Sequence, residues 1–183
     1  MTLVDIYNRA FIALGQHPIV DENDTSRRSL LIASAYPTIY KEFLGLRNWT
    51  FSRKRSTLNP MTSSPREGYD AYTLPSDFIN VIEANGTDAK YEIEGSILYI
   101  NASSLILVYN SSSTDINRIS PLGIKVLALL LAEALCDTLT QSTEKERKIM
   151  TKRQMALADA SHSDSSNDFE IEIDDIEAID VRY

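Results

Sequence analysis

The chain of 183 residues contains one cysteine and two histidines, so it is poor in the side chains that most often bind metals. A single cysteine, Cys136, excludes a disulfide bond within the chain and fits synthesis in a reducing cytoplasm. Neither His17 nor His162 has a second ligand-type residue at metal-binding spacing. We therefore expect no metal site and no cofactor. Cys136 is expected to be a core residue, because no base that would activate its thiol can be identified.

Glycine is also scarce. The six glycines form no G-x-G-x-x-G motif, no P-loop and no G-x-S-x-G motif, so neither a nucleotide-binding loop nor a nucleophile elbow is indicated. Glu83, Glu92 and Glu94 could be interpreted as a glycosidase pair. However, the alternation in YEIEG places Glu92 and Glu94 on the solvent side of a strand whose Ile93 faces the core. The sequence therefore predicts no catalytic residue, and we do not expect an enzyme.

No hydrophobic run is long enough to predict a membrane span. The strongest candidate, Leu122–Leu139, contains three charged residues and is shorter than the ~20 apolar residues that a bilayer requires. Asp5 and Arg9 interrupt the apolar pattern of the N-terminal residues, so no signal peptide is predicted. We expect Leu122–Leu139 to be a buried helix of a soluble protein that has no membrane partner.

An excess of positive charge is missing as well, since the formal net charge is −8. Residues 164–183 carry eight acidic residues and one arginine, and the remainder of the chain is close to neutral. A near-neutral body exerts no strong long-range attraction on DNA phosphates, and an acidic extension repels them. The overall charge therefore does not favour a nucleic-acid-binding protein.

One segment differs from the rest of the chain because it is rich in basic residues. LRNWTFSRKR, at positions 46–55, gathers four basic side chains around Trp49, the only tryptophan. If the segment is extended, Arg53 and Arg55 lie on one face and Lys54 on the other. Three interpretations stay open: a solvated strand whose aromatic residues anchor the preceding helix, a protein–protein contact, or a nucleic-acid contact. We treat Trp49, Arg53, Lys54 and Arg55 as candidate interface residues.

The C-terminal segment NDFEIEIDDIEAIDVRY provides the other candidate surface. Phe169, Ile171 and Ile173 alternate with acidic residues, a pattern that predicts a half-buried strand. A disordered acidic tail would not normally carry so many large apolar residues or end in Tyr183. We therefore predict that Phe169, Ile171, Ile173 and Tyr183 are interface residues that order against a neighbouring subunit or partner by strand addition. Plain disorder is the alternative.

Apolar periodicity predicts four helices, at 3–14, near 24–46, at 121–140 and near 143–161. Thr2 is the expected N-cap of the first helix. Pro37 lies inside the second and should kink or split it. The third is apolar on most sides, so we place it at the centre. After the fourth, SHSDSSND predicts a flexible linker.

Turn signals and short extended runs predict a small antiparallel β region at about 51–110, with a hairpin turn at Asn85-Gly86, a reversal between two short strands at 94–96 and a strand at SLILVYN. The predicted fold class is α+β, mainly α: a four-helix bundle with this small β region inserted between helices two and three, and an extended C-terminal tail. Residues 1–163 are expected to form a single helical-bundle domain, and residues 164–183 an acidic extension.

Taken in order, these segments resemble the head-to-tail adaptor family of short-tailed bacteriophages, also called tail tubular protein A. The likeness rests on IYNRAFIALGQHPI, on a helix closing with NWTFSRKRSTL, on YTLPSDF, on the YEIEG hairpin, and on the P…VLALLLAEAL…LTQS helix with the charged helix after it. It covers nearly the whole chain. Two positions depart from the family pattern: Ser52 stands where alanine is expected after Phe51, and Pro37 interrupts the second helix.

The resemblance implies a structural virion protein that forms a ring of about twelve copies between the portal and the tail nozzle, a conduit for genome ejection. Its expected partners are neighbouring copies, the portal protein, the tail nozzle protein and tail fibres, while DNA passes through without specific binding. Such a protein is made in the host bacterial cytoplasm and resides at the head–tail junction of the virion. Two alternatives stay open: a cell-wall lytic enzyme of the phage tail, and a DNA-binding or other assembly interaction domain.

Overall fold

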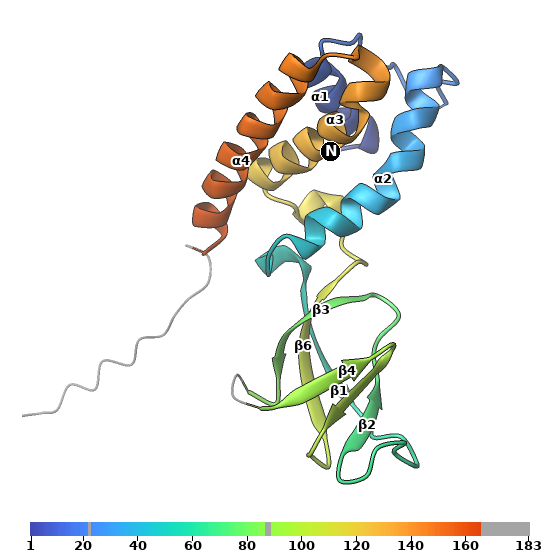
Figure 1. Cartoon of the computed structure of the whole chain (residues 1–183), viewed down its shortest axis with the longest axis vertical. Helices are drawn as coiled ribbons and strands as arrows, with labels where there is room; N and C mark the ends of the chain where they lie inside the picture. Colours follow the sequence, from blue (N-terminus) through green and yellow to red (C-terminus); the bar gives the residue numbers. More distant parts are fainter. Residues whose placement is uncertain (22, 87–88, 166–183) are drawn as a thin grey trace, which may run out of the picture.

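The computed structural model of the chain describes residues 1–21, 23–86 and 89–165. The helices gather in one lobe and the strands in another, and the chain crosses between the lobes after α2 and again before α3 (Figure 1). In chain order the elements are α1 (Leu3–Leu14), α2 (Arg27–Gly45), the 3-10 turn η1 (Thr50–Ser52), β1 (Arg53–Leu58), β2 (Asp70–Thr73), β3 (Phe78–Ala84), β4 (Tyr91–Glu94), β5 (Ile97–Ile100), β6 (Leu105–Ser111), the 3-10 turn η2 (Ile116–Arg118), α3 (Pro121–Thr140) and α4 (Thr143–Ser165).

The helix boundaries follow from local signals in the sequence. Thr2 and Asp5 form a capping box, in which each side chain accepts a hydrogen bond from the other residue's backbone N–H. The helix ends at Gly15, whose φ of 68° is a left-handed conformation that glycine adopts without strain. Ser120 caps α3 and Pro121 follows at the first helical position, where a missing N–H costs nothing. The predicted cap of α1 and the predicted start of α3 are therefore confirmed.

Pro37 lies inside α2, which continues as one helix from Arg27 to Gly45. A proline in a helix interior cannot donate its backbone hydrogen bond, and its ring clashes with the preceding turn. The helix accordingly changes direction near its middle instead of breaking (Figure 1). Of the two predicted outcomes, the kink is confirmed, and the split of the helix does not occur.

The helical core is built around α3, against which α1, α2 and α4 all pack. Most residues of α3 are buried, including all of those from Val126 to Ala132. This explains its weak amphipathic pattern, because a helix surrounded on most sides has no polar face to present. The predicted central position of this helix is confirmed.

The strands form two antiparallel sheets, in the orders β1-β6-β3 and β2-β5-β4. Side chains from both sheets share a second hydrophobic core, separate from the helical one. Its large buried members are Tyr72 and Leu98 from one sheet and Leu105, Leu107 and Tyr109 from the other. The predicted reversal at 94–96 is confirmed, since Gly95 turns β4 into the paired strand β5. The hairpin predicted at Asn85-Gly86 is wrong: both residues have positive φ after β3, but β3 pairs with β6, and the next strand, β4, belongs to the other sheet.

The predicted fold class is wrong. The described residues form four α-helices and two three-stranded sheets, with about 20% of these residues in strands and 49% helical, so the β region is not a small insertion in a four-helix bundle. The sequence underestimates it because its strands have only four to seven residues, too few for alternation to be distinct. Only the pairing of the strands into two sheets shows that these short segments enclose a hydrophobic core of their own.

Two local expectations also need correction. Ile93 does not face the core: β4 is an edge strand and the Ile93 side chain is 39% exposed. The fourth helix continues through Ser165, so the start of the predicted linker is helical and Asp164 is buried. Among the helices of the described residues, none combines the length and the apolar character that crossing a bilayer would require.

Candidate interaction surfaces

Trp49 belongs to the helical core. Its side chain is 0% exposed and packs against both Phe43 and Phe51, with ring centroids 4.9 and 5.4 Å away. The indole Nε1–H donates to the carbonyl oxygen of Phe43 at 2.8 Å, so its one polar atom is satisfied. Trp49 was predicted as an interface residue, but its side chain is enclosed and anchors the end of α2 instead.

Arg47 and Asp164 form an ion pair next to Trp49, at one end of the helical lobe. The guanidinium of Arg47 lies over the indole at 5.3 Å and forms an ion pair with Asp164 at 3.6 Å. The Asp164 carboxylate also accepts hydrogen bonds from the backbone N–H and the hydroxyl of Thr50, at 3.2 and 2.6 Å. The last turn of α4 is therefore tied to the segment between α2 and β1. No local sequence signal could reveal this contact, because it joins residues 114 positions apart.

Asn110 connects the two lobes through a buried polar network. Its side-chain amide donates to the carbonyl oxygen of Arg47 and to the side-chain oxygen of Asn80, both at 2.9 Å. Its own side-chain oxygen accepts from the Ser52 hydroxyl at 2.9 Å. Asn110 is 0% exposed, and a buried amide is stabilising only when its hydrogen bonds are made. The network therefore holds β6 against the segment that leaves α2.

Lys54 is tied to the β lobe. Its ammonium lies 2.6 Å from the Asp77 carboxylate, which also accepts hydrogen bonds from the hydroxyls of Ser111 and Tyr109 at 2.7 and 3.0 Å. Burial alone would raise the pKa of Asp77, but these three donors outweigh burial and lower it to about 2. Burial raises the pKa of Tyr109, and its hydrogen bond to the carboxylate raises it further, to about 12. Lys54 thus has a partner within its own lobe.

The two arginines of the basic segment lie on an edge strand. Among the described strands, β1 pairs only with β6, and Arg53 and Arg55 are both exposed. As predicted from alternation, they share one face of the strand while Lys54 points to the other. Arg55 makes no ion pair within the part of the chain that the structure describes. Of the basic triplet, Arg55 is therefore the best placed to meet a partner.

The predicted interface residues of the C-terminal segment, Phe169, Ile171, Ile173 and Tyr183, lie outside the described residues. Their role stays a prediction from the sequence. The described chain ends at Ser165, immediately after Asp164, so the position from which this segment departs is defined by the contacts of Asp164.

The residues weighed for chemistry are dispersed. Cys136 is buried and its sulfur lies 3.3 Å from the hydroxyl oxygen of Thr140. Glu92 forms an ion pair with Arg66, whose hydrogen bond holds the pKa of Glu92 below its ordinary value. His17 is exposed in the turn after α1. Within the described ranges, no group of three or more His, Cys, Asp or Glu side chains could hold a metal ion.

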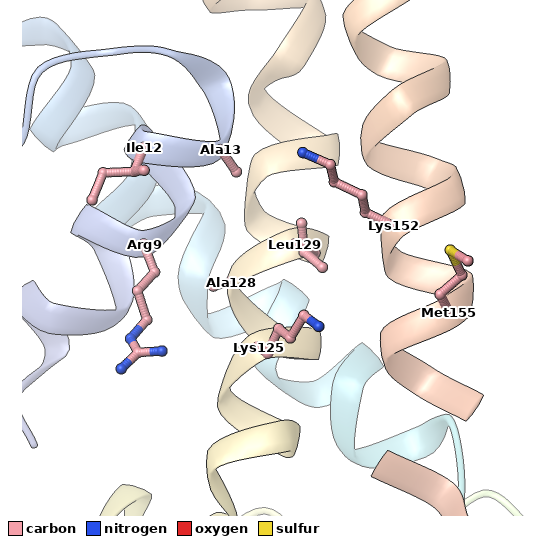
Figure 2. A pocket seen from close by; sticks show the side chains of 8 residues that line it. All are labelled: Arg9, Ile12, Ala13, Lys125, Ala128, Leu129, Lys152 and Met155. Carbon is pink, nitrogen blue, oxygen red and sulfur yellow. The ribbon is translucent and has the colours of Figure 1, made fainter. Parts of the chain in front are cut away.

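The structure also contains a groove that sequence reasoning missed. It lies between α1, α3 and α4 and encloses a volume of about 430 Å³ (Figure 2). Its floor is apolar, with Leu129 between the exposed side chains of Ile12 and Met155. Arg9 and Lys125 line it together with Lys152, and none of its lining residues is acidic. The groove could not be predicted because its lining combines α1, near the start of the chain, with α3 and α4, which follow the β region.

No protein-family model matches the chain, and no curated protein matches it.

Proposed function

We propose that this protein is a structural virion component that closes into a ring-shaped head-to-tail adaptor between portal and tail nozzle, at the head–tail junction. The proposal rests first on the sequence resemblance, which follows the order of segments along nearly the whole chain. The observation that carries it further is charge separation within one chain. An exposed basic face on β1 is combined with a terminal segment that has seven acidic residues and one arginine after Ser165.

A ring requires a heterologous interface, in which one patch of each copy meets a different patch of the next. Opposite charges on separate parts of the chain suit such an interface, because they attract between copies and repel between identical patches. Their main contribution is to register and specificity rather than to affinity. A chain with one basic face and one acidic segment meets this requirement without any further component.

The two-lobed shape supports the same function. The β lobe extends away from the helical lobe, so each lobe presents surfaces that the other does not cover (Figure 1). The buried network around Asn110 holds the lobes together at their junction. In an adaptor, the helical lobes would form the wall of the ring. The β lobes and the terminal segments would contact neighbouring copies, the portal, the nozzle and the fibres.

Electron microscopy and mass measurement test the proposal, on the full-length protein alone and after mixing with the portal of the same phage. We expect annular particles of about twelve copies in at least one of the two conditions. A particle that stays a single copy in both conditions, and also in purified virions, would rule the adaptor function out.

DNA passage provides a second test. With a formal net charge of −8 per copy, an assembled ring repels phosphates and allows a duplex to slide without being gripped. In a gel-shift titration at low and moderate salt, we expect only weak binding of duplex DNA. Tight binding that weakens steeply with salt would instead indicate a DNA-binding module.

A further inference from the structure

The groove between α1, α3 and α4 exposes apolar side chains that a folded chain would normally cover. Ile12 is 67% exposed on α1, and Met155 is 66% exposed on α4. Between them the floor is formed by Leu129 of α3, and the enclosed volume is about 430 Å³ (Figure 2). Apolar surface in a concave site of this size is typical of a binding site.

The charge around the groove has one sign. Arg9 comes from α1, Lys125 from α3 and Lys152 from α4, and no acidic residue lines the groove. Asp5, one turn before Arg9, accepts a hydrogen bond from the backbone N–H of Thr2 and belongs to the helix cap. Three cations over an apolar floor favour an occupant that carries both carboxylates and large aliphatic side chains.

The chain itself contains such a segment. Residues 168–181 include seven acidic residues, one phenylalanine and five Ile or Val, and no basic residue. We propose that residues 168–181 of one copy occupy the groove of a neighbouring copy. Phe169 and the isoleucines would cover the apolar floor, and the acidic side chains would meet the three cations. This inference rests on the proposed function and assigns the acidic segment to the groove, which leaves the basic face of β1 to meet other acidic residues of a neighbouring copy or of the portal.

The position of the chain exit favours a neighbouring copy over the same one. Asp164 is held by Thr50 and Arg47, so the last described turn of α4 lies beside the segment that follows α2. Met155 lies ten residues earlier on α4, about 15 Å back along the helix axis. To occupy the groove of its own copy, the segment would have to run back along α4. The same segment, extended to as much as about 50 Å, can instead reach an adjacent copy.

A charge-swap experiment on the full-length protein tests the contact. Arg9→Glu/Lys125→Glu/Lys152→Glu reverses the groove, and Glu170→Lys/Glu172→Lys/Asp174→Lys reverses the segment. Each triple variant should lower the assembled fraction about tenfold in mass photometry at low salt, and the combination of both should restore it. Lys41→Glu/Lys90→Glu/Arg118→Glu changes the net charge equally at exposed sites outside the groove and should assemble normally. Unchanged assembly of the variant with the reversed groove and of the variant with the reversed segment would overturn the proposal. So would a failure to restore assembly in a combined variant whose circular dichroism matches the original.

Cross-linking identifies which copy supplies the segment. Met155→Cys protein is mixed with Ile171→Cys protein and oxidised, so that a disulfide between these two positions can form only between copies. The native Cys136 is 0% exposed and contributes no background. We expect the mixture to give a covalent dimer on a denaturing gel in excess of the dimer that each variant forms when oxidised alone. The variant that carries both Met155→Cys and Ile171→Cys is oxidised at high dilution for comparison. If its disulfide forms only within one chain and the mixture gives no dimer, the segment occupies the groove of its own copy and the proposal is overturned.

These results separate this inference from the proposed function. Annular particles that persist with a reversed groove and without cross-linking would retain the adaptor function and refute the groove contact. A cross-link between copies in a protein that never forms annular particles would retain the contact and refute the ring.

Discussion

At the scale of single residues, the basic segment divides into side chains that stabilise the fold and side chains that can meet a partner. Trp49 is enclosed by Phe43 and Phe51, and Lys54 is held by Asp77. Arg55 remains exposed on the outer face of the edge strand. The sequence pattern suggested one surface, but these residues have three different roles: Trp49 packs in the core, Lys54 forms an ion pair within the β lobe, and Arg55 is exposed and can meet a partner.

The role of Trp49 in the core can be tested by truncation. Trp49→Ala should lower the free energy of unfolding by about 3–5 kcal/mol, because it leaves a cavity beside the rings of Phe43 and Phe51. Trp49→Phe should cost much less, since it keeps most of the apolar contact and loses mainly the indole hydrogen bond. Urea denaturation followed by circular dichroism measures both. If Trp49→Ala kept full stability but abolished assembly, the predicted interface role would be right and the core role wrong.

The ion pair of Lys54 and Asp77 predicts an acid sensitivity. The folded-state pKa of Asp77 is about 2, below the ordinary value of 3.8, so the stabilisation is present above pH 4 and is lost as the pH falls toward 2. We expect roughly 1–2 kcal/mol from this group, toward the low end because solvent screens the exposed ammonium. Lys54→Met should flatten the fall in unfolding free energy between pH 4 and 2.

Arg55→Met is the matched control for this measurement, since it removes a neighbouring charge from the opposite face of the same strand. Its stability between pH 4 and 2 should follow that of the original protein. Equal slopes for Lys54→Met and the original protein would show that the pair with Asp77 is not what stabilises the lobe.

At the scale of elements, the last turn of α4 shows how one contact extends a helix. The sequence predicts a linker here because Ser, His and Asp are frequent in turns and poor in helix interiors. In the structure, Asp164 satisfies the backbone N–H and the hydroxyl of Thr50 and meets the guanidinium of Arg47. The tertiary contact outweighs the weak local preference, so the helix continues through Ser165.

Replacing Asp164 should therefore loosen this turn. Asp164→Ala leaves Thr50 without its acceptor and should lower the free energy of unfolding by about 1–2 kcal/mol. Asp159→Ala, at an exposed position of the same helix, should change it by less than about 0.5 kcal/mol. Hydrogen exchange of the final turn of α4 should speed up only in the first variant. Equal effects of the two substitutions would mean that the contact adds no stability.

At the scale of the whole molecule, a ring multiplies each weak contact by the number of copies. Arg55→Glu places a negative charge on the outer face of β1 without disturbing Lys54 and Asp77, so it should reduce the assembled fraction while the unfolding free energy stays within about 0.5 kcal/mol. Reversing all three basic residues is less informative, because a glutamate at position 54 would repel Asp77 within the lobe. Mass photometry compares the variants, with Lys90→Glu as an exposed control. If the Arg55→Glu variant assembled normally, Arg55 would not be part of the interface between copies.

The sequence by itself determined the helices of this protein, because caps, glycine stops and apolar periodicity act over a few neighbouring residues. Thr2, Gly15 and Ser120 defined helix boundaries that the structure retains. It also determined the acidity of the C-terminal segment and the alternation of charges on β1. These properties depend on residue identity and on local geometry alone.

Only the tertiary structure decided how large the β lobe is, which basic residues are buried or paired, and where a groove opens. Short strands acquire a core only when two sheets meet, as Tyr72 and Leu107 do from opposite sheets. Arg9, Lys125 and Lys152 become neighbours only because α1 and α4 pack on α3. Contacts between distant parts of a chain depend on the packing of the whole, and no short stretch of sequence contains that information.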